Sequence, residues 1–443
     1  MWNLKEIALV LGCQTERNDQ IGQFAIDSRL VEKGGIFFAL PGEKVDGHQF
    51  LQEIAAKGGV AAIVREDYAG PDFGLALLRV RDVKKSLQTL AKKAFSRRRE
   101  KVVAITGSMG KTTTKEFVTT LLETKYRVAK TPGNYNTQLT LPLTILNLEG
   151  EYDVLVLEMG MGDTGQIAQL VQIAPPDIAL VTRIAPAGME DFRGGLEAIA
   201  KAKAEIFSHH KTTLGIMSAQ AAGFGAVYYG GGIPKWIYGW KEDLFDGREA
   251  DFVMEEKAEG VVINDSPPIS LGFEGKHLKE NFLGAVALAR AMNLSWKEIQ
   301  DQATKCRPYK RRFEKIEREG ITFIQDCYNA NPESVSAALL NLPRPAKEGK
   351  VIGVLGTMPD LGKASSHYHK EVGTFAANVL DRLLCIGKEA NGIAESFSQS
   401  GKEAEHFTDV AAVREKLFAL AKPGDVVLIK GANSLKLWEI LEG

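Results

Sequence analysis

One short segment of the 443-residue chain limits its fold more than any other: an apolar run that ends in a glycine-rich turn and a lysine. The run KVVAIT at residues 101–106 is typical of a buried strand, and the turn GSMGK at 107–111 leads into a helical pattern. Glycines in such a turn let backbone N–H groups face a phosphate, and the helix N-terminus adds positive potential. Lys111 supplies a cation, and a threonine hydroxyl after it can reach Mg²⁺. The segment therefore predicts a cradle for a nucleoside triphosphate.

The spacing of this loop differs from that of generic GTPases and kinases. The residue five positions before Gly110 is Ile105, where the usual loop has glycine. A glycine turn with an unrelated lysine is the alternative interpretation, but the strand and the helix on either side favour the phosphate cradle.

The composition excludes several other classes of protein. Hydrophobic residues make up 44% of the chain and charged residues 25%, which is ordinary for a globular protein and too apolar for a disordered one. Lys and Arg total 55 against 56 Asp and Glu, so no global charge favours binding to nucleic acid or to an acidic membrane. The four cysteines lie far apart without a CxxC pair, which indicates reduced thiols.

The N-terminal residues and the hydropathy of the chain bear on its location. The segment MWNLKEIALVLGC favours an amphipathic helix over a signal peptide, because it contains Glu6 and lacks a basic region. No window reaches the roughly 18 consecutive apolar residues of a membrane span. We therefore expect a cytoplasmic protein without membrane insertion and without a nucleic-acid partner.

The alternation of strand and helix patterns predicts an α/β fold in three domains. Residues 1–97 contain short strand-like runs at 36–40 and 60–64 among glycine turns and form a small α/β domain. Residues 98–308 alternate strands and helices around the phosphate cradle, which predicts a central P-loop ATPase domain with a parallel sheet. Residues 309–443 repeat that alternation and predict a Rossmann-like C-terminal domain.

Further polar residues lie at the ends of strands or on helices. Glu158 ends an apolar strand and is placed to hold Mg²⁺, although a charge that caps a surface strand is the alternative. By spacing alone, Lys203 is a solvated lysine of an amphipathic helix. The turn DCYNANPES at 326–334 either binds a ligand or is rich in asparagine because Asn tolerates unusual backbone angles. His277 and Asn281, four apart on one helix face, either contact a base or merely cover the helix.

Together these motifs resemble the Mur ligase family of ATP-dependent, amide-bond-forming enzymes of peptidoglycan synthesis. The resemblance spans essentially the whole chain. It rests on Asp27-Ser28-Arg29, GGIFFALPGEKVDGHQF (34–50), TGSMGKTTT (106–114), GNYNTQLTLP (133–142), LEMG (157–160), AKAKAEI (200–206), DCYNANPES (326–334), GTMPDLG (356–362), His369 and KGANSLKLWE (430–439).

The resemblance implies a reaction and its substrates. It is strongest to the branch that joins D-alanyl-D-alanine to UDP-N-acetylmuramoyl-tripeptide, with the N-terminal domain binding the UDP-linked substrate. ATP would phosphorylate the tripeptide carboxylate, and the dipeptide amine would attack the acyl phosphate to give ADP, phosphate and a pentapeptide. ATP and Mg²⁺ are the implied cofactors, and we expect a monomer.

The resemblance also implies residue roles. Lys111 would bind the β- and γ-phosphates, and a carbamylated Lys203 would hold Mg²⁺ together with Thr112 and Glu158. Lys111, Lys203 and Glu158 form the implied catalytic set. The implied ATP contacts are Gly107, Ser108, Met109, Gly110, Lys111, Thr112, Thr113, His277, Asn281, Arg312 and Asp326. The implied substrate contacts are Ser28, Arg29, Asn136, Thr137, Asn329, Asn331 and Pro332.

The chain departs from the family pattern at several positions. Where the family usually reads Asn-Ile-Gly-x-Ala-His, this chain has Arg183 in place of the asparagine. It has Gly188 in place of the histidine, which is expected to bind a second Mg²⁺. We hypothesise that Arg183 places a fixed positive charge there and takes over part of the metal's role. At the other departures, Arg311 replaces the usual glycine of the domain linker, and Thr357 replaces the aspartate of a Gly-Asp-Met turn. Near the end, Ala432 and Asn433 replace the Ser and Arg of a Gly-Ser-Arg segment.

Two alternatives stay open from the sequence. A Mur-like ligase with a different acyl or amine substrate would carry the same motifs. A P-loop phosphotransferase or NTPase would share the cradle, but the missing first glycine of the loop and the separate DCYNANPES block argue against it. Phosphate release from ATP separates the classes, because a ligase requires both a UDP-muramoyl peptide and an amine.

Overall fold

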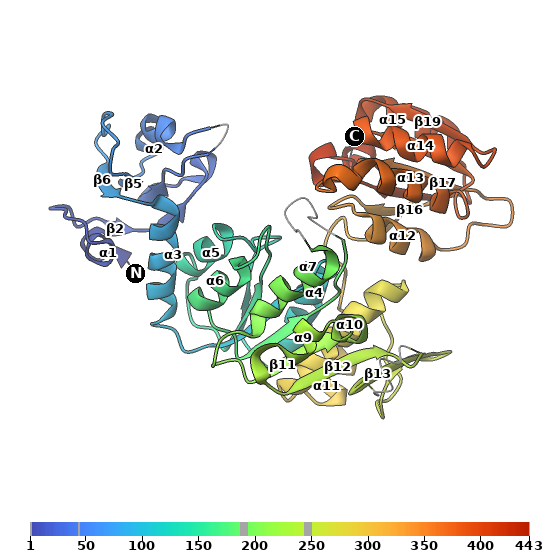
Figure 1. Ribbon diagram of the computed structural model, residues 1–443, viewed down its shortest axis with the longest axis horizontal. Coiled ribbons are helices and arrows are strands. Elements are labelled where there is room, and N and C mark those ends of the chain that lie inside the picture. The colour runs from blue at the N-terminus through green and yellow to red at the C-terminus, as the bar shows by residue number, and fades with distance from the viewer. Residues whose placement is uncertain (1, 43–44, 187–193, 243–249, 443) are drawn as a thin grey trace. The chain divides into compact units, whose positions relative to one another are not determined.

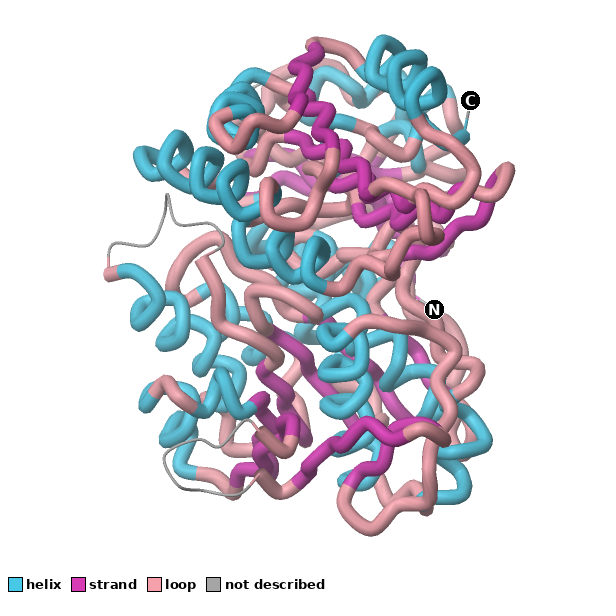
Figure 2. Tube along the Cα trace, turned by 90° about the vertical axis from the view of Figure 1, so that its right-hand side faces the viewer, coloured by secondary structure: helices cyan, strands magenta, loops and turns pink. Residues whose placement is uncertain are grey.

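The structure is a computed structural model that describes residues 2–42, 45–186, 194–242 and 250–442 (Figure 1). The chain packs as two compact units. The first contains Met1–Ala104, Tyr126–Ala179 and Glu205–Thr213, and the second contains Ile105–Lys125, Leu180–Ala204 and Leu214–Gly443. Strands and helices alternate along both units (Figure 2), which confirms the predicted α/β class.

The N-terminal residues form a small parallel sheet. Its strands follow the order β3 (Gln23–Ala25), β4 (Gly35–Phe38), β5 (Ala61–Arg65) and β6 (Ala76–Val80). β4 and β5 confirm the strands predicted at 36–40 and 60–64. The predicted N-terminal helix is α1 (Leu4–Leu11), which Asn3 caps at its start and Gly12 ends in the left-handed conformation. Earlier in the sequence, β1 (Trp2–Asn3) pairs with β2 (Gln20–Ile21) in a separate antiparallel sheet.

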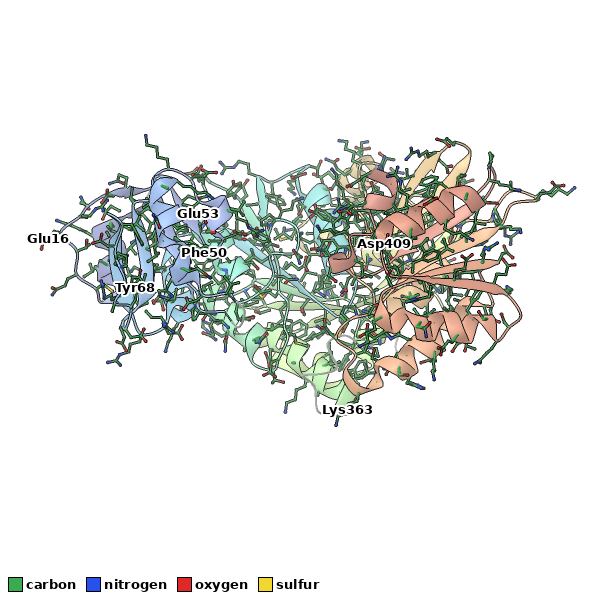
Figure 3. All side chains as sticks on the ribbon, turned by 90° about the horizontal axis from the view of Figure 1, so that it is seen from above. Glu16, Phe50, Glu53, Tyr68, Lys363 and Asp409 are labelled. Carbon is green, nitrogen blue, oxygen red and sulfur yellow. The ribbon has the colours of Figure 1, made fainter. Side chains whose placement is uncertain are left out.

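The short helix α2 (Leu51–Ala56) covers this sheet. Its Leu51 and Ile54 belong to one core with Phe37, Ala62 and Val64 of the strands. Figure 3 shows Phe50, Glu53 and Tyr68 on the blue N-terminal ribbon, and Tyr68 packs against the same core. The remaining elements of this region are η1 (Ser28–Leu30), η2 (Gly47–Phe50) and α3 (Val83–Phe95).

The second sheet follows the order β14-β13-β12-β11-β10-β7-β9-β8. Its strands are β7 (Lys101–Thr106), β8 (Val128–Lys130), β9 (Val154–Glu158), β10 (Ile178–Val181), β11 (Leu214–Ser218), β12 (Lys235–Trp240), β13 (Phe252–Lys257) and β14 (Gly260–Ile263). β8 with β9, β11 with β12, and β12 with β13 run parallel, and the β13–β14 pair is antiparallel. β7, β9 and β10 confirm the strands predicted in this block.

The elements around this sheet are α4 (Lys111–Leu122), α5 (Thr140–Leu146), α6 (Gln166–Ile173), α7 (Gly195–Ala204), η3 (Glu205–Phe207), α8 (Ala219–Ala222), α9 (Gly225–Tyr229), η4 (Gly230–Gly232), α10 (Lys276–Ala291) and α11 (Trp296–Ala303). β7 is buried because its apolar run leaves no side chain from Val102 to Ile105 exposed. Each fully buried Val or Ile contributes about 1.5–3 kcal/mol, so this strand is a firm base for the loop that follows it.

The C-terminal sheet follows the order β15-β16-β20-β17-β18-β19. Its strands are β15 (Glu314–Arg318), β16 (Ile321–Asp326), β17 (Val351–Gly356), β18 (Arg382–Ile386), β19 (Glu403–Phe407) and β20 (Val426–Lys430). All neighbours run parallel except β15 and β16, which form an antiparallel hairpin. Because β20 lies between β16 and β17, the strand order reverses there, which is where doubly wound sheets bind ligands.

The helices of the C-terminal sheet cover it in two groups. They are α12 (Pro332–Leu340), η5 (Gly362–Ala364), α13 (Ser365–Ala376), η6 (Lys388–Ala390), α14 (Asn391–Ser398), α15 (Val410–Leu420), η7 (Asn433–Leu435) and α16 (Glu439–Glu442). α12, α13 and α14 pack against one another. α15 and α16 close one core through Val413, Leu417 and Ile440, which meet Phe323 and Val427 of the strands. The predicted Rossmann-like layering is confirmed here.

The structure also bears on the cysteines and on the search for a membrane-spanning helix. All four cysteines are free thiols, and Cys306, Cys327 and Cys385 are buried. Among the helices that the structure describes, none combines the length and the apolar composition that a bilayer crossing requires.

Candidate nucleotide and substrate site

The glycine turn after β7 has the backbone that the phosphate cradle requires. Gly107 and Gly110 adopt φ values of 148° and 82°, a region that side chains disfavour. A Cβ at Gly107 would collide with the hydroxyl of Thr182, and one at Gly110 with the side chain of Asn281. Gly110 caps α4 without any side-chain hydrogen bond. Glycine has no side chain to cover the start of α4, where the helix dipole favours an anion.

Lys111 and Thr112 begin α4 at this cradle. The Lys111 Nζ donates to the carbonyl oxygens of Gly107 at 2.8 Å and Ser108 at 3.2 Å, so its ammonium lies over the loop. Thr112 is buried, and its hydroxyl lies 3.5 Å from a guanidinium nitrogen of Arg312. Both side chains lie where the sequence placed them.

One pocket of the second unit collects most of the predicted nucleotide residues. Its lining comes from the glycine turn, from α10, from the segment around Arg312 and from the C-terminal sheet. The residues are Ser108, Met109, Gly110, Thr113, Arg183, His277, Leu278, Asn281, Arg312, Phe313, Asp326, Asn329, Asn331, Ser334, Ala337 and Lys430. Sequence segments more than 200 positions apart thus meet at one pocket.

The pocket holds His277 and Asn281 on the face of α10 that the sequence predicted. The His277 ring meets the ring of Phe313 edge-on, with centroids 4.7 Å apart. Burial lowers the pKa of His277 to about 4, so its imidazole is neutral at neutral pH. Its Nδ1 is buried and has no hydrogen-bond partner among the described residues. A neutral ring with a free polar atom beside a phenyl ring fits a heteroaromatic base.

The carboxyl ends of two strands of the C-terminal sheet add an ion pair to the pocket. Asp326 and Lys430 are partners in the parallel register of β16 and β20, and Lys430 Nζ donates to Asp326 Oδ2 at 2.7 Å. The same ammonium donates to the carbonyl of Asn329 at 3.1 Å. Lys430 therefore fixes the start of the DCYNANPES turn, although the sequence analysis assigned it no role.

One asparagine of the DCYNANPES turn, Asn331, caps a helix and has no unusual backbone angle. Asn331 has an extended backbone, with φ −144° and ψ 165°, and is the N-cap of α12. Its side chain accepts from the N–H of Ser334 at 2.8 Å, while the Ser334 hydroxyl accepts from the N–H of Asn331 at 3.0 Å. Pro332 follows as the first helical residue, a position that proline favours. The unusual-angle interpretation was wrong for Asn331.

Lys203 differs from the solvated lysine that spacing alone predicted. It is buried on α7, with 5% of its surface exposed. Burial, with a smaller contribution from the charge of Lys111, lowers the pKa of Lys203 well below its ordinary value. Burial therefore favours the neutral amine over the ammonium, and the neutral amine is the form that reacts with electrophiles.

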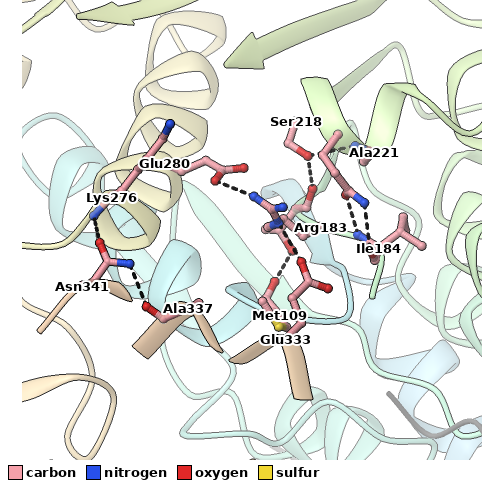
Figure 4. A network of polar contacts seen from close by, with 12 residues as sticks. Met109, Arg183, Ile184, Ser218, Ala221, Lys276, Glu280, Glu333, Ala337 and Asn341 are labelled. Carbon is pink, nitrogen blue, oxygen red and sulfur yellow. Dashed lines mark hydrogen bonds and ion pairs between the residues drawn. The ribbon is translucent and has the colours of Figure 1, made fainter. Parts of the chain in front are cut away.

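Arg183 is neutralised by two carboxylates. Its guanidinium contacts Glu280 of α10 at 2.9 Å and Glu333 of α12 at 3.4 Å, as Figure 4 shows. Burial raises the pKa of Glu333, although Arg183 opposes that rise. The positive charge expected at Arg183 is therefore balanced by carboxylates, and its share in the metal's role stays a hypothesis. Gly188, the other departure in this segment, lies outside the described residues.

Arg311 keeps a backbone conformation that suits the glycine usual at this position. Its φ is 64°, in the left-handed region, which costs a side-chain-bearing residue about 1 kcal/mol. Two contacts offset this cost: the guanidinium lies 3.9 Å from the ring centroid of Trp438 and 2.9 Å from Glu442. The departure from glycine thus adds a link between the linker and the last helix.

The first unit contains a second group of predicted residues. Glu158, the last residue of β9, is buried, and its Oε1 accepts from Asn136 Nδ2 at 2.6 Å. The Asn136 carbonyl accepts from the N–H of Gly160, where a Cβ would meet the Asn136 side chain. The neighbouring Thr137 hydroxyl pairs with that of Thr140 at 3.0 Å. The LEMG and GNYNT motifs therefore form one cluster, which the sequence did not reveal.

Ser28 and Arg29 lie in η1, after β3 of the N-terminal sheet. Asp27 caps this turn, and its carboxylate pairs with Arg29 at 2.6 Å. Arg29 is 83% exposed, whereas Ser28 is buried and its carbonyl accepts from Lys57. The arginine of this motif is thus available to an anionic group in solution.

Several residues of the site escaped the sequence analysis. Lys430, Glu280 and Glu333 act through partners that are distant in sequence, and the side chain of Gln220 bonds to the backbone of Ile184. Of these residues, only Lys430 could have been predicted from the sequence. It ends an apolar strand in the block that carries Asp326, and parallel strands end at the same edge of a sheet.

The glycine cradle, the pocket around His277 and the doubly wound C-terminal sheet define a multidomain nucleotide-using α/β enzyme. Three family descriptions match the chain: the Mur ligase family catalytic domain at residues 20–96, the Mur ligase middle domain at 105–289 and the Mur ligase glutamate ligase domain at 311–433.

Relatives match along almost the full chain. The UDP-N-acetylmuramoyl-tripeptide--D-alanyl-D-alanine ligases of Bacillus subtilis and Escherichia coli are each 31% identical to it, over 94% of this chain and 92% of theirs. The crystal structure of MurF from Acinetobacter baumannii has a TM-score of 0.83 at 25% identity and covers 100% of this chain and 98% of its own. MurF from Thermotoga maritima in complex with ADP has a TM-score of 0.78 at 29% identity and covers 95% and 96%. The chain belongs to the Mur ligase family.

Proposed function

We propose that this protein is an ATP-dependent, ADP-forming ligase that joins D-alanyl-D-alanine to UDP-N-acetylmuramoyl-tripeptide in peptidoglycan precursor synthesis. The observation that carries the proposal is the pocket in which the glycine cradle, His277, Asp326 and Lys430 meet. The relatives that bear this activity in their names match this chain over more than nine-tenths of its length.

The chemistry requires an activated carboxylate. A carboxylate resists attack by an amine, because the leaving group would be an oxide ion. Transfer of the γ-phosphoryl group from ATP to a tripeptide carboxylate oxygen breaks the bond to ADP and forms an acyl phosphate. The dipeptide amine then attacks the carbonyl carbon, inorganic phosphate leaves, and the amine loses a proton.

The residues of the cradle supply what this transfer needs. The first N–H groups of α4 and the ammonium of Lys111 neutralise the phosphates as charge moves between anions. His277, Asn281 and Phe313 hold the base, and Arg312 and Asp326 close the nucleotide side of the pocket. Asn329, Asn331 and Pro332 form the turn that we assign to the incoming dipeptide, while Ser28 and Arg29 serve the UDP-linked substrate.

We propose that a magnesium ion binds with the nucleotide supplying most of its ligands. Among the described residues, His, Cys, Asp and Glu side chains nowhere gather in threes to form a metal cage. Mg²⁺ usually needs only one or two protein carboxylates beside the phosphates. Thr112, Glu158 and a carbamylated Lys203 would hold it, and the ion would neutralise charge on the phosphates during transfer. Asn136 orients Glu158 through its hydrogen bond.

We assign Lys203 to carbamylation because its amine is buried and burial favours the neutral form. Addition of CO₂ to that amine releases a proton and yields a carboxylate. We expect Lys203→Ala to lose activity, with added short carboxylates restoring part of it. Lys201→Ala, on the exposed side of the same helix, is the matched control and keeps full activity. Failure of every short carboxylate to restore Lys203→Ala would contradict this role.

A substrate matrix tests the proposed reaction. UDP-muramoyl peptides are combined with D-amino-acid dipeptides, ATP and Mg²⁺, and the products are read by mass. We expect one product, heavier than the UDP-tripeptide by one D-alanyl-D-alanine less one water, and only when both substrates are present. Phosphate release without either substrate would indicate an NTPase, and a product only with another amine or acyl partner would indicate a different ligase.

The division into domains at 1–97, 98–308 and 309–443 belongs to the same proposal. It is supported by the three matched ranges, each of which falls inside one of these blocks. A cytoplasmic location accords with substrates that are nucleotide-linked, and the monomeric state stays a prediction.

A further inference from the structure

The segment that follows β10 lies directly against the phosphate cradle. The Ser108 N–H donates to the carbonyl of Arg183 at 2.7 Å, and Met109 and Arg183 form an antiparallel bridge. The N–H of Ala185 donates to the Ser108 hydroxyl at 3.0 Å. The Thr182 hydroxyl donates to the carbonyls of Thr106 and Met109. The position of residues 182–185 therefore sets the position of the loop.

Ile184 is the residue of this segment that does not bond to the loop through the contacts above. Its side chain is 1% exposed, so an unpaired peptide group at this position would be costly. The side chain of Gln220 pairs both of its polar groups. The Ile184 N–H donates to Gln220 Oε1 at 3.0 Å, and Gln220 Nε2 donates to the Ile184 carbonyl at 2.9 Å. Figure 4 shows these two bonds at Ile184, beside Arg183 and Met109.

Gln220 can do this because of where α8 begins. β11 ends at Ser218, whose side chain caps α8 by accepting from the N–H of Ala221 and donates to the carbonyl of Thr182. Gln220 follows two residues later, so its amide reaches the next peptide group of the same segment. The Gln220 amide thus pairs with the Ile184 peptide group, as the backbone of a neighbouring strand would.

We propose that Gln220 is a positioning residue for the nucleotide: it holds residues 182–185 in place, and they hold the Ser108–Met109 part of the cradle. Its side chain is not part of the pocket lining. The inference rests on the proposed use of ATP but not on the identity of the acyl or amine substrate. It predicts that loss of the Gln220 amide weakens nucleotide binding more than it weakens binding of the UDP-linked substrate.

The test measures binding of ADP and Mg²⁺, so that it does not depend on turnover. Gln220→Met keeps the length of the side chain and removes both hydrogen bonds, and we expect its Kd for ADP to rise about tenfold. Gln220→Glu keeps only the acceptor for the Ile184 N–H, and its Kd should lie between those of the parent and Gln220→Met. The Kd for UDP-N-acetylmuramoyl-tripeptide should stay within twofold of the parent for both variants.

Gln300→Met is the matched control. Gln300 also donates from its side-chain amide to a distant backbone carbonyl, that of Pro268 at 2.7 Å, but outside the nucleotide pocket. It should bind ADP as the parent does. In the parent itself, hydrogen exchange of the amides of residues 182–185 should slow when ADP binds, because the segment and the loop are coupled.

Three results would overturn the role of Gln220. They are a folded Gln220 variant that binds ADP within twofold of the parent, an equal loss of affinity for both ligands, and hydrogen exchange at 182–185 that ADP leaves unchanged. These results are independent of the ligase reaction. A parent that binds ADP but forms no pentapeptide would contradict the proposed function and leave the role of Gln220 intact.

Discussion

Two strand-turn-helix junctions of the second unit face the same pocket and differ in how each helix starts. At the β7–α4 junction, two glycines with positive φ turn the backbone, and no side chain caps α4. At the β16–α12 junction, Asn331 and Ser334 bond to each other's backbone N–H groups. An open helix start offers its N–H groups to an anion, whereas a capped start offers side chains. This difference supports the proposal that phosphate binds at the first junction and the dipeptide at the second.

The largest expected effect comes from the cation at the open junction. Lys111→Ala should lower turnover by at least about 100-fold, because the ammonium stabilises charge that moves between phosphate and carboxylate. Lys101→Ala, at the exposed start of the same strand, is the control and should keep parent activity. Both variants should keep the parent's circular dichroism spectrum. Near-parent turnover by folded Lys111→Ala would contradict the assignment of phosphate to this junction.

The next effect separates capping from substrate contact at the closed junction. Asn331→Ala removes the cap of α12 and should lower the free energy of unfolding by about 1 kcal/mol. Asn331→Ser keeps a capping hydroxyl, so it should restore stability. We expect both variants to raise the KM for D-alanyl-D-alanine and to leave the Kd for ADP unchanged. Full recovery of that KM in Asn331→Ser would show that Asn331 serves only the helix.

The third effect concerns the base pocket beside both junctions. Burial lowers the pKa of His277 to about 4 in the folded protein, against about 6.5 in an unfolded chain. Between these values the unfolded state binds more protons, so the folded state loses stability as the pH falls from about 6.5 towards 4. This loss is at most about 1.4 kcal/mol per pH unit.

Urea unfolding of the parent and of His277→Asn at pH 7.5 and pH 5.0 checks this expectation. The parent should lose more stability between the two pH values than the variant does. His367→Asn, at a ring that is 77% exposed, is the control and should behave as the parent. An equal loss in the parent and in His277→Asn would show that the His277 imidazole is not buried as a neutral group.

The sequence predicted the local parts of this site better than the contacts between them. The glycine turn and the Asp and Asn of the C-terminal turn were found because each lies in an unbroken motif after a strand. Asn331 was misread, because the same residue type serves left-handed turns and helix caps, and only the backbone angle separates the two. Lys203 was misread by spacing, because burial of a helix face depends on what packs against it.

Residues that act across the fold could not be found from the sequence. Gln220 lies 36 positions after Ile184, on a helix of four residues that no periodicity reveals. Glu280 and Glu333 are ordinary helix carboxylates until Arg183 is placed between them. Their roles follow from the order of strands in the sheets, which brings distant segments to one pocket.

The transfer of phosphate to a carboxylate is the central claim, and an oxygen label tests it most directly. UDP-N-acetylmuramoyl-tripeptide with ¹⁸O at both oxygens of its reacting carboxylate is incubated with the protein, ATP, Mg²⁺ and D-alanyl-D-alanine, and the released inorganic phosphate is analysed by mass spectrometry. The account predicts one ¹⁸O atom in the phosphate for each pentapeptide formed, because that carboxylate oxygen leaves with the phosphoryl group. Phosphate without the label, with pentapeptide formed in the same mixture, would contradict it.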